Sequence, residues 1–447
     1  YIILGLIMAG LFQVFFWLSR DNLVTLNENS FEKIESLSYS PFEGYDKNLL
    51  SSEQINYDVN LFENFTNKLR TYGTLEAYKI LQSSKDSNLP IDLGLWIGGD
   101  LEANNLEIQR ALEILKEYPN RIQSVIVGNE VLLRKELEPL ELYAYIDFMK
   151  SHTKKPVTTA ETWDIWEKNP QLASHVDFLT IHILPYWEKV PIERYNEFII
   201  EKYSVVEELF PNRKIVIGET GWPSHGYNNN SAIPSIKNQA QAIRGFVNLA
   251  HEKGWHYNII EALDQPWKGY DEGNVGQYWG IFTTDRALKF QLAGEVELNK
   301  YWLYQMIAAI VIGALLTIFG LKNQRVNISH AFAYAIAAQG MAFGIVMAAI
   351  YPFVNYMNFG MWIMWGMGSF LMIPLVIITL AKANELFRSS IGVQPSRLVP
   401  LDLKSKNAPL VSIHVPAYKE QPHVLAETLE SLSRLTYPNF EVLVIIN

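Results

Sequence analysis

The sequence contains no cysteine and no excess of basic residues. The absence of cysteine from its 447 residues excludes disulfides, thiolate metal sites and cysteine nucleophiles. A formal net charge of −10 argues against a nucleic-acid partner, because proteins of that class carry a basic surface. The sequence also has no Gly-x-Gly-x-x-Gly run and no phosphate-cradling lysine motif, so generic dinucleotide or ATP binding is unsupported.

Long uncharged apolar runs, by contrast, are present at four places. Each approaches the roughly 20 residues that a helix needs to cross a bilayer. The sequence therefore predicts transmembrane helices at residues 1–20, 300–322, 331–352 and 359–381. A cleaved signal peptide is the alternative for the first run, but no small-residue cleavage site follows Arg20.

The basic residues near these runs predict the orientation in an inner or plasma membrane. Lys322 and Arg325 follow the second run, and Lys382 and Arg388 follow the fourth, whereas the loop after the third run is uncharged. Because basic loops favour the cytoplasmic side, we expect a cytoplasmic linker at 382–408 and an extracytoplasmic domain at 30–295. Arg20 is a weak signal in the opposite direction. The lipid bilayer is thus an expected partner.

Short apolar or β-branched runs recur about every 30 residues in the domain at 30–295. Helical patterns lie between several of them, for example at 108–118 and 238–254. Strands that alternate with helices in this way are typical of a (β/α)₈ barrel, in which functional residues follow the carboxyl ends of the strands. The eight predicted strands are 34–40, 68–73, 91–99, 122–130, 155–162, 176–183, 214–220 and 256–263.

Two carboxylates end predicted strands of this barrel. Glu130 ends the fourth strand and Glu219 the seventh, so both should face the mouth of the barrel. If they lie about 5 Å apart, one can attack a sugar carbon while the other protonates the leaving oxygen, with net retention of configuration. Asn129 precedes Glu130 and is a candidate donor to the sugar 2-hydroxyl. A lone Glu at a strand end is more often a solvated cap or an ion-pair partner, and it is the pair that favours catalysis.

Other strand-end residues allow two interpretations. His182 is more often a satisfied polar residue than a catalyst, and Arg70 and Lys268 could simply pair with acids and shift their pKa values. The tryptophans near strand ends fit packing or sugar platforms equally well, since apolar sugar faces favour aromatic rings. These tryptophans are Trp96, Trp163, Trp187, Trp222, Trp267 and Trp279.

Three motifs, "VIVGNEVL", "VIGETGWPS" and "EALDQPWKGY…VGQYWGIF", resemble glycoside hydrolase family 17 over about residues 32–292. The resemblance implies a β-1,3-glucan substrate, Glu130 as acid/base and Glu219 as nucleophile, with neither a cofactor nor a metal in the barrel. Gln265 departs from the family, which often has Glu there, and this puts an auxiliary carboxylate in doubt. The expected substrate contacts are Tyr39, Arg70, Tyr72, Asn129, Tyr186, Trp222, Glu261, Asp264 and Lys268.

The last segment, 409–447, reads as strand, loop, amphipathic helix, turn and strand, the start of an α/β domain. Its first loop resembles that of processive family 2 glycosyltransferases, which implies a truncated GT-A-type domain whose Ala417, Tyr418 and Glu420 contact a nucleotide sugar. Lys419 replaces the usual Asn. UDP-glucose and a divalent metal are expected only for the intact glycosyltransferase. The chain starts at Tyr1 and ends inside an apolar run, so we expect a fragment of a longer protein, inactive in sugar transfer from a nucleotide donor.

Three hypotheses for the barrel follow. The favoured one is a transglycosylase that processes glucan emerging from a synthase, because tethering beside a synthase concentrates acceptor chains. The second is plain endo-hydrolysis of β-1,3-glucan, and the third is a non-catalytic domain that guides glucan chains.

Overall fold

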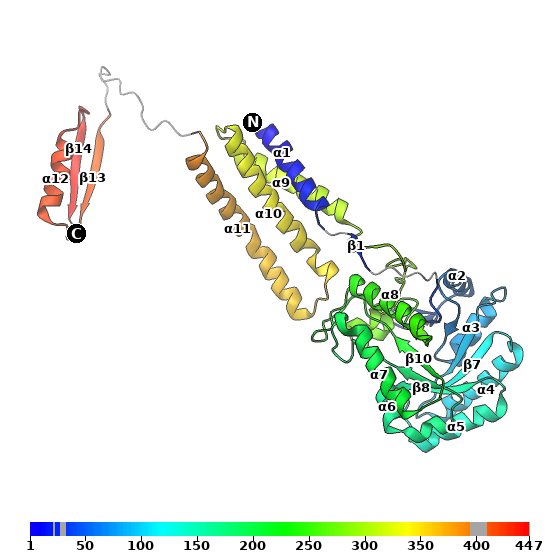
Figure 1. Cartoon of the computed structure of the whole chain (residues 1–447). Coiled ribbons are helices and arrows are strands. Elements are labelled where there is room, and N and C mark those ends of the chain that lie inside the picture. Colours follow the sequence, from blue (N-terminus) through cyan, green and yellow to red (C-terminus); the bar gives the residue numbers. More distant parts are fainter. Residues whose placement is uncertain (21–22, 27–32, 394–408, 447) are drawn as a thin grey trace. The chain divides into compact units, whose positions relative to one another are not determined.

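The structure, a computed structural model, describes residues 1–20, 23–26, 33–393 and 409–446 (Figure 1). Most of the linker expected at 382–408 therefore lies outside the described residues. Contacts divide the chain into two compact units, Tyr1–Glu385 and Leu386–Asn447, and each is treated separately below.

Eight parallel strands of the first unit close into a barrel. They pair in the order β10-β11-β2-β5-β6-β7-β8-β9, so β11, the last barrel strand in the chain, pairs with β2, the first. All eight predicted strands and the (β/α)₈ architecture are confirmed. The strands are β2 (Leu37–Ser38), β5 (Leu69–Arg70), β6 (Ile91–Leu95), β7 (Ile122–Asn129), β8 (Val157–Thr162), β9 (Leu179–His182), β10 (Ile215–Thr220) and β11 (His256–Ile259).

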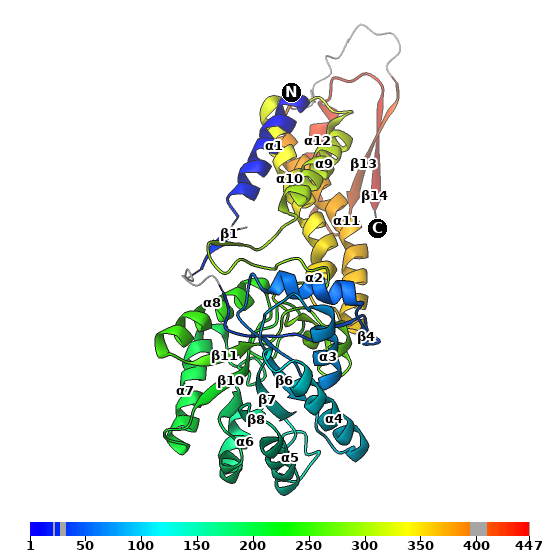
Figure 2. The same cartoon turned by 90° about the vertical axis from the view of Figure 1, so that its right-hand side faces the viewer.

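Helices surround this barrel, as Figure 2 shows for α4 to α7. Side-chain caps fix where several of them begin: Ser51 accepts from Gln54 N at α2, and Ser235 accepts from Asn238 N at α8. The helical patterns at 108–118 and 238–254 are confirmed within α4 and α8. The helices are α2 (Ser52–Phe62), α3 (Thr74–Ser83), α4 (Leu101–Glu117), α5 (Pro139–His152), α6 (Trp163–Lys168), α7 (Tyr195–Leu209) and α8 (Ile236–Lys253).

Smaller elements complete the barrel domain. A hairpin of β3 (Phe42–Glu43) and β4 (Asn48–Leu49) follows the first barrel strand, and the 3₁₀ turns η3 (Pro266–Gly269) and η4 (Asn274–Tyr278) follow the last. Further 3₁₀ turns are η1 (Pro170–Ser174) and η2 (Ile192–Arg194). β1 (Leu23–Thr25) pairs antiparallel with β12 (Glu295–Glu297), which joins the segments that enter and leave the domain.

Four apolar helices match the uncharged runs. Three of them, α9 (Trp302–Leu321), α10 (Ile328–Val354) and α11 (Phe359–Ser390), are long and apolar enough to cross a membrane. The fourth, α1 (Ile2–Leu18), is a shorter apolar helix of 17 residues. α11 continues past residue 381 to Ser390, so the part of the expected linker at 382–390 is helical.

The second unit contains β13 (Val411–Ala417), α12 (Pro422–Ser433) and β14 (Phe440–Ile446). The two strands pair in parallel, with Val411 opposite Phe440 and Ala417 opposite Ile446. The predicted order of strand, helix and strand is therefore confirmed, and the parallel pairing requires the helical crossover between them.

Candidate active site

Irregularities in the barrel strands aim two carboxylates at its mouth. The pairing register shifts between Ile217 and Glu219 in β10, and between Ile126 and Asn129 in β7. Such bulges re-aim side chains near sites of chemistry. Gly218 is needed for the close approach of β10 to β9, because a Cβ there would lie 2.4 Å from Thr180 Cγ2 and 3.1 Å from His182.

Glu130, His182 and Glu219 gather where these strands end. One carboxylate oxygen of each Glu and one ring nitrogen of His182 all lie within 4.8 Å of one another. The shortest of these contacts joins His182 Nδ1 to Glu130 Oε1 at 2.8 Å. The two carboxylates are thus close enough for the two-carboxylate chemistry of a retaining glycosidase, which uses a separation of about 5 Å.

Arg70 forms hydrogen bonds that connect several residues of this cluster. Its Nη1 donates to Glu219 Oε1 at 3.2 Å and also to the carbonyl of Gly218, while Nη2 donates to Asn129 Oδ1 at 2.6 Å. The guanidinium is buried, so this charge-assisted contact is shielded from water and holds the Glu219 carboxylate in place. Asn129 Oδ1 is occupied by Arg70, which leaves the amide N–H₂ of Asn129 to donate elsewhere.

The contacts of His182 assign its proton. Nε2 lies 3.3 and 3.4 Å from the two Nη atoms of Arg70, which can only donate. Nε2 must therefore be the acceptor in a neutral ring, and the proton lies on Nδ1, where it is donated to Glu130. A hydrogen-bonded chain thus runs from Glu219 through Arg70 and His182 to Glu130.

The backbone of Glu130 is held in an uncommon conformation, with φ at +56°. Left-handed conformations of non-glycine residues persist where the surroundings determine them, often at functional sites. Here Glu130 N donates to the Ala160 carbonyl at 2.7 Å, and the buried Glu161 carboxylate accepts from Leu132 N at 2.8 Å and Leu133 N at 3.3 Å. Glu161 therefore anchors the turn that carries Glu130. Burial raises the pKa of Glu161 to about 7, although these backbone donors oppose the shift.

Opposing effects act on the pKa of Glu130. Partial burial raises it, but the hydrogen bond from His182 and the charges of Arg134 and Arg70 lower it by more, so the pKa of Glu130 lies below its usual value. An acid/base needs to exchange its proton with solvent, and 23% of the Glu130 side chain is exposed, compared with 6% for Glu219.

The same three side chains have the composition of a metal site, since each offers one ligand atom. The Arg70 guanidinium, however, lies against Glu219 and His182 and already supplies positive charge there. A cation among these ligands would lie beside that guanidinium and be repelled by it. The donor set therefore does not fit a resident metal.

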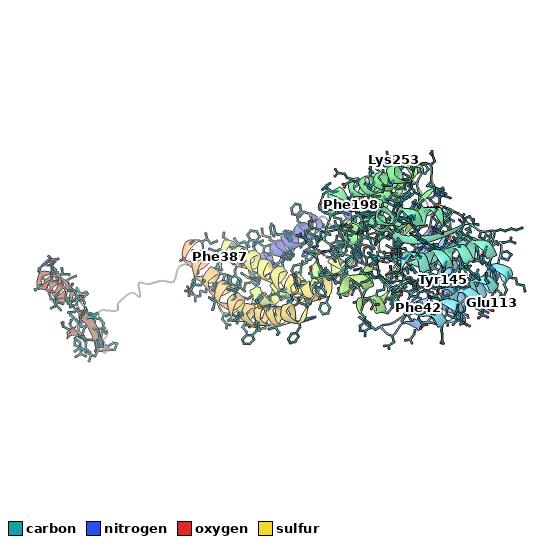
Figure 3. All side chains as sticks on the ribbon, turned by 90° about the horizontal axis from the view of Figure 1, so that it is seen from below. Phe42, Glu113, Tyr145, Phe198, Lys253 and Phe387 are labelled. Carbon is teal, nitrogen blue, oxygen red and sulfur yellow. The ribbon has the colours of Figure 1, made fainter. Side chains whose placement is uncertain are left out.

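A cavity of about 550 Å³ opens beside the two carboxylates. Figure 3 shows the side chains of the barrel and labels Phe42, which comes from the β3 strand and is one of the lining residues. The lining comes from the ends of β7 and β10 and from the segments that follow β2, β5, β6, β7 and β11. It comprises Ser40, Phe42, Lys47, Tyr72, Gly73, Leu75, Glu76, Trp96, Asn129, Glu130, Arg134, Glu219, Ile260, Trp267, Lys268, Asp271 and Glu272.

The structure brings some of the expected substrate contacts to this cavity. Tyr72, Asn129 and Lys268 line it with the two carboxylates, and Arg70 contacts Asn129 and Glu219 from beneath. Glu261 does not line the cavity, but its carboxylate pairs with Nζ of the lining residue Lys268 at 2.6 Å.

Four of the expected contacts do not line this cavity, and their side chains contact other parts of the barrel domain. Trp222 is fully buried, and its indole N–H donates to the Ile233 carbonyl. Tyr186 packs edge-on against Trp222 and donates to the Tyr227 carbonyl.

The other two side chains, Tyr39 and Asp264, have buried polar partners. Tyr39 donates its hydroxyl to Asp58 at 2.9 Å. Asp264 pairs with Lys289 at 2.7 Å. None of the four lines the cavity.

Two of the tryptophans that line the cavity each have a cation close to the ring. Trp96 is 46% exposed, and the Arg134 guanidinium lies 4.5 Å from its ring centroid. Trp267 has Lys47 Nζ at 4.2 Å from its centroid. Both tryptophans were considered as platforms on sequence grounds, but Arg134 and Lys47 carry no local signal that distinguishes them from solvated surface residues.

Gln265 has a supporting role in this arrangement. Its Nε2 donates to the Ser40 carbonyl at 2.9 Å, and its Oε1 accepts from the indole N–H of Trp267 at 2.6 Å. The side chain is buried and does not reach the cavity. Gln265 therefore holds the Trp267 ring in place and provides no carboxylate to the site.

The residues expected to contact a nucleotide sugar lie in the second unit. Ala417 ends β13, and Tyr418 and Glu420 follow it in the loop that precedes α12. Tyr418 is exposed, and Lys419 has a φ of +59°. Their place after a parallel strand is the place where open α/β sheets bind ligands.

Comparisons with known proteins agree with this geometry. Residues 36–280 match the family described as the BtgE/BtgC glycoside hydrolase domain. The chain is similar to a glucan 1,3-beta-glucosidase of Schizosaccharomyces pombe, with 27% identity over 255 residues that cover 53% of this chain and 79% of the relative.

Solved structures with the same fold include two glucan-active enzymes. An active-site mutant of Rhizomucor miehei beta-1,3-glucanosyltransferase in complex with laminaritriose has a TM-score of 0.53 and 25% identity, covering 57% of this chain and 95% of that chain. An endo-laminarinase from Formosa has a TM-score of 0.51 and 21% identity, covering 59% of this chain and 86% of that chain.

Proposed function

The chain belongs to the BtgE/BtgC glycoside hydrolase domain family, and on this premise we propose that its barrel is a retaining enzyme that acts on β-1,3-glucan. The observation that carries the proposal is the proximity of Glu130 and Glu219, whose oxygens lie within 4.8 Å. The glucan-active relatives from Schizosaccharomyces pombe and Rhizomucor miehei support the substrate class.

The exposure and contacts of each carboxylate suggest its role, and Glu130 must take up a proton before it acts as the acid, because its pKa is lowered. Glu219 is the nucleophile: it attacks the anomeric carbon while Glu130 protonates the departing glycosidic oxygen, which leaves a glycosyl ester on Glu219. Glu130 then removes a proton from the incoming hydroxyl, which displaces Glu219 and restores the original configuration. Arg70 orients the nucleophile, and the amide of Asn129 donates to the sugar 2-hydroxyl.

The incoming hydroxyl decides between two outcomes. If it belongs to another glucan chain the enzyme is a transglycosylase, and if it belongs to water the enzyme is a hydrolase. We favour transfer, and the glucanosyltransferase from Rhizomucor miehei supports this choice. Plain endo-hydrolysis is the second candidate, and a non-catalytic guiding domain is the third.

The apolar helices and the second unit support a wider proposal. The helices α9, α10 and α11 would cross an inner or plasma membrane, with the barrel outside and the second unit in the cytoplasm. That unit would be the start of a nucleotide-sugar-dependent glycosyltransferase, whose intact form would make β-glucan from UDP-glucose with a divalent metal. The barrel would then process the emerging chain.

Product analysis of the full chain in detergent micelles tests the function of the barrel. The purified protein is incubated with a laminari-oligosaccharide of defined length, and product size and linkage are read by mass spectrometry and NMR. Products longer than the substrate support transfer, and products that are only shorter support hydrolysis. Absence of turnover, with oligosaccharide still bound, would favour the guiding domain and contradict the proposal.

A further inference from the structure

Glu272 is a carboxylate of the cavity that the two-carboxylate mechanism does not use. It lies between η3 and η4, in the segment that follows the last barrel strand, and its backbone N–H donates to the Lys268 carbonyl at 2.9 Å. Gly276 leaves room for the side chain, because a Cβ at that position would lie 2.6 Å from Glu272 Cβ and 3.0 Å from Glu272 Oε2. The turn thus directs Glu272 toward the cavity.

Three other carboxylates that line the cavity, Glu130, Glu219 and Glu76, have partners in the protein. Glu130 is bonded to His182 and Glu219 to Arg70, and Glu76 accepts from the backbone N–H groups of Tyr72 and Gly73 at the start of α3. Within residues 33–393, by contrast, the Glu272 carboxylate forms no side-chain hydrogen bond and no ion pair within 4.0 Å. Burial, together with the charges of Glu261, Glu219 and Glu130, raises the pKa of Glu272 to about 7 even though Lys268 opposes the shift.

Lys268 is a hydrogen-bond donor that lines the same cavity as Glu272 but does not contact its carboxylate. Its ammonium pairs with Glu261 at 2.6 Å, which uses one of three N–H donors, and it also lies 5.7 Å from the ring centroids of Tyr72 and Trp267. The charge of Glu272 raises the pKa of Lys268, but no ion pair within 4.0 Å joins the two side chains. An ammonium can only donate hydrogen bonds and a carboxylate can only accept them.

A hydroxyl group both donates and accepts, so a sugar hydroxyl placed between these two groups satisfies both. We propose that Glu272 and Lys268 form a hydroxyl-recognition pair for a glucosyl unit in the cavity, which makes Glu272 a specificity-determining residue. The adjacent Trp267 and Tyr72 rings offer apolar surface to the face of the same sugar. This inference rests on the proposed function of the barrel.

Binding to a catalytically blocked background tests the pair separately from catalysis. The full chain with Glu219→Gln is titrated with laminarihexaose by calorimetry in detergent micelles, alone and combined with Glu272→Gln. Glu272→Gln replaces a charged acceptor by a weaker neutral one, which is expected to weaken binding by about tenfold. Asp285→Asn is the control, because Asp285 is an exposed carboxylate that does not line the cavity, and this change should leave the Kd within about twofold.

In the otherwise wild-type chain, Glu272→Gln should raise KM with kcat within about threefold, since a contact made equally before and during the reaction changes KM alone. Unchanged binding after Glu272→Gln is added to the Glu219→Gln background would overturn the inference, as would an equal loss after Asp285→Asn. Unfolding midpoints that match the parent chain verify that any loss is local. Wild-type turnover separates the two proposals: an active enzyme unaffected by Glu272→Gln contradicts this inference only, whereas a chain that neither binds nor turns over glucan contradicts the proposed function.

Discussion

The ends of β7 and β10 present the same side chain in two different settings. Glu219 is almost fully buried, lies at the irregular end of β10 and pairs with Arg70. Glu130 is partly exposed, has a left-handed backbone and accepts a hydrogen bond from His182. The difference suits the two roles, because a nucleophile needs a fixed position, whereas an acid/base needs access to protons and solvent.

Removal of the nucleophile is expected to have the largest effect. Glu219→Gln keeps the shape of the side chain but removes the attacking oxygen, so turnover of a laminari-oligosaccharide should fall by about 10⁴-fold or more. Reducing-end and chain-length assays of the full chain measure this loss. Turnover within tenfold of wild type would refute the assignment of Glu219.

Glu130→Gln should reveal the other role through its dependence on the leaving group. Because this change removes protonation and not attack, poor leaving groups should slow by about 10²- to 10⁴-fold, while an activated aryl β-glucoside of laminaribiose slows much less. Rates for both substrate types, measured on one preparation, give the comparison. Equal slowing of the two would mean that Glu130 is not the acid.

Arg70→Lys tests whether Glu219 depends on a forked donor. Lys has a single point charge and cannot contact Glu219, Asn129 and Gly218 together, so kcat should fall by roughly 10²-fold while the fold is retained. Steady-state kinetics with laminaripentaose measure the change, and a control unfolding curve reports the fold. A kcat near the wild-type value would show that the position of Glu219 is set by its strand alone.

The smallest expected effect concerns Glu161, which anchors the turn of Glu130. Its pKa is raised from 4.5 to about 7 in the folded state, so the unfolded chain loses its proton first and folding stability falls as pH rises from about 4.5 to 7. Glu161→Gln removes this fall. Relative to wild type, the variant should gain on the order of 2 kcal/mol between pH 5 and pH 8.

Urea unfolding of both proteins at the two pH values checks the prediction for Glu161. The groups that face its carboxylate are the N–H groups of Leu132 and Leu133, with His182 and Glu130 nearby. The same pH dependence in both proteins would contradict a raised pKa for Glu161.

The sequence was sufficient for the barrel and for its two carboxylates. Strand runs such as 122–130 are short, β-branched and bounded by turn residues, and the order of the carboxyl ends then places Glu130 and Glu219 at one face. Strand-end position alone could not tell which way Tyr39, Tyr186, Trp222 and Asp264 point. Successive side chains of a strand face opposite sides, and beyond the strand the chain has no period to follow.

Loop residues of the cavity were the hardest to foresee. Phe42, Trp96 and Glu272 come from three separate connections, and only the closed barrel brings those connections together. Glu272 is one of several acidic residues in its part of the chain, and no local pattern distinguishes it from the exposed Asp271. Its direction toward the cavity depends on its contacts with Gly276 and Lys268, which form only in the folded protein.

The most direct test of the account is to identify the residue that becomes covalently glycosylated. A 2-deoxy-2-fluoro laminaribiosyl donor with a good leaving group slows the second step, so the glycosyl ester accumulates and can be located by peptide mass spectrometry of the full chain. We predict a single label on the peptide that contains Glu219, and no label in Glu219→Gln. A label on Glu130, Glu272 or any other carboxylate would contradict the central claim.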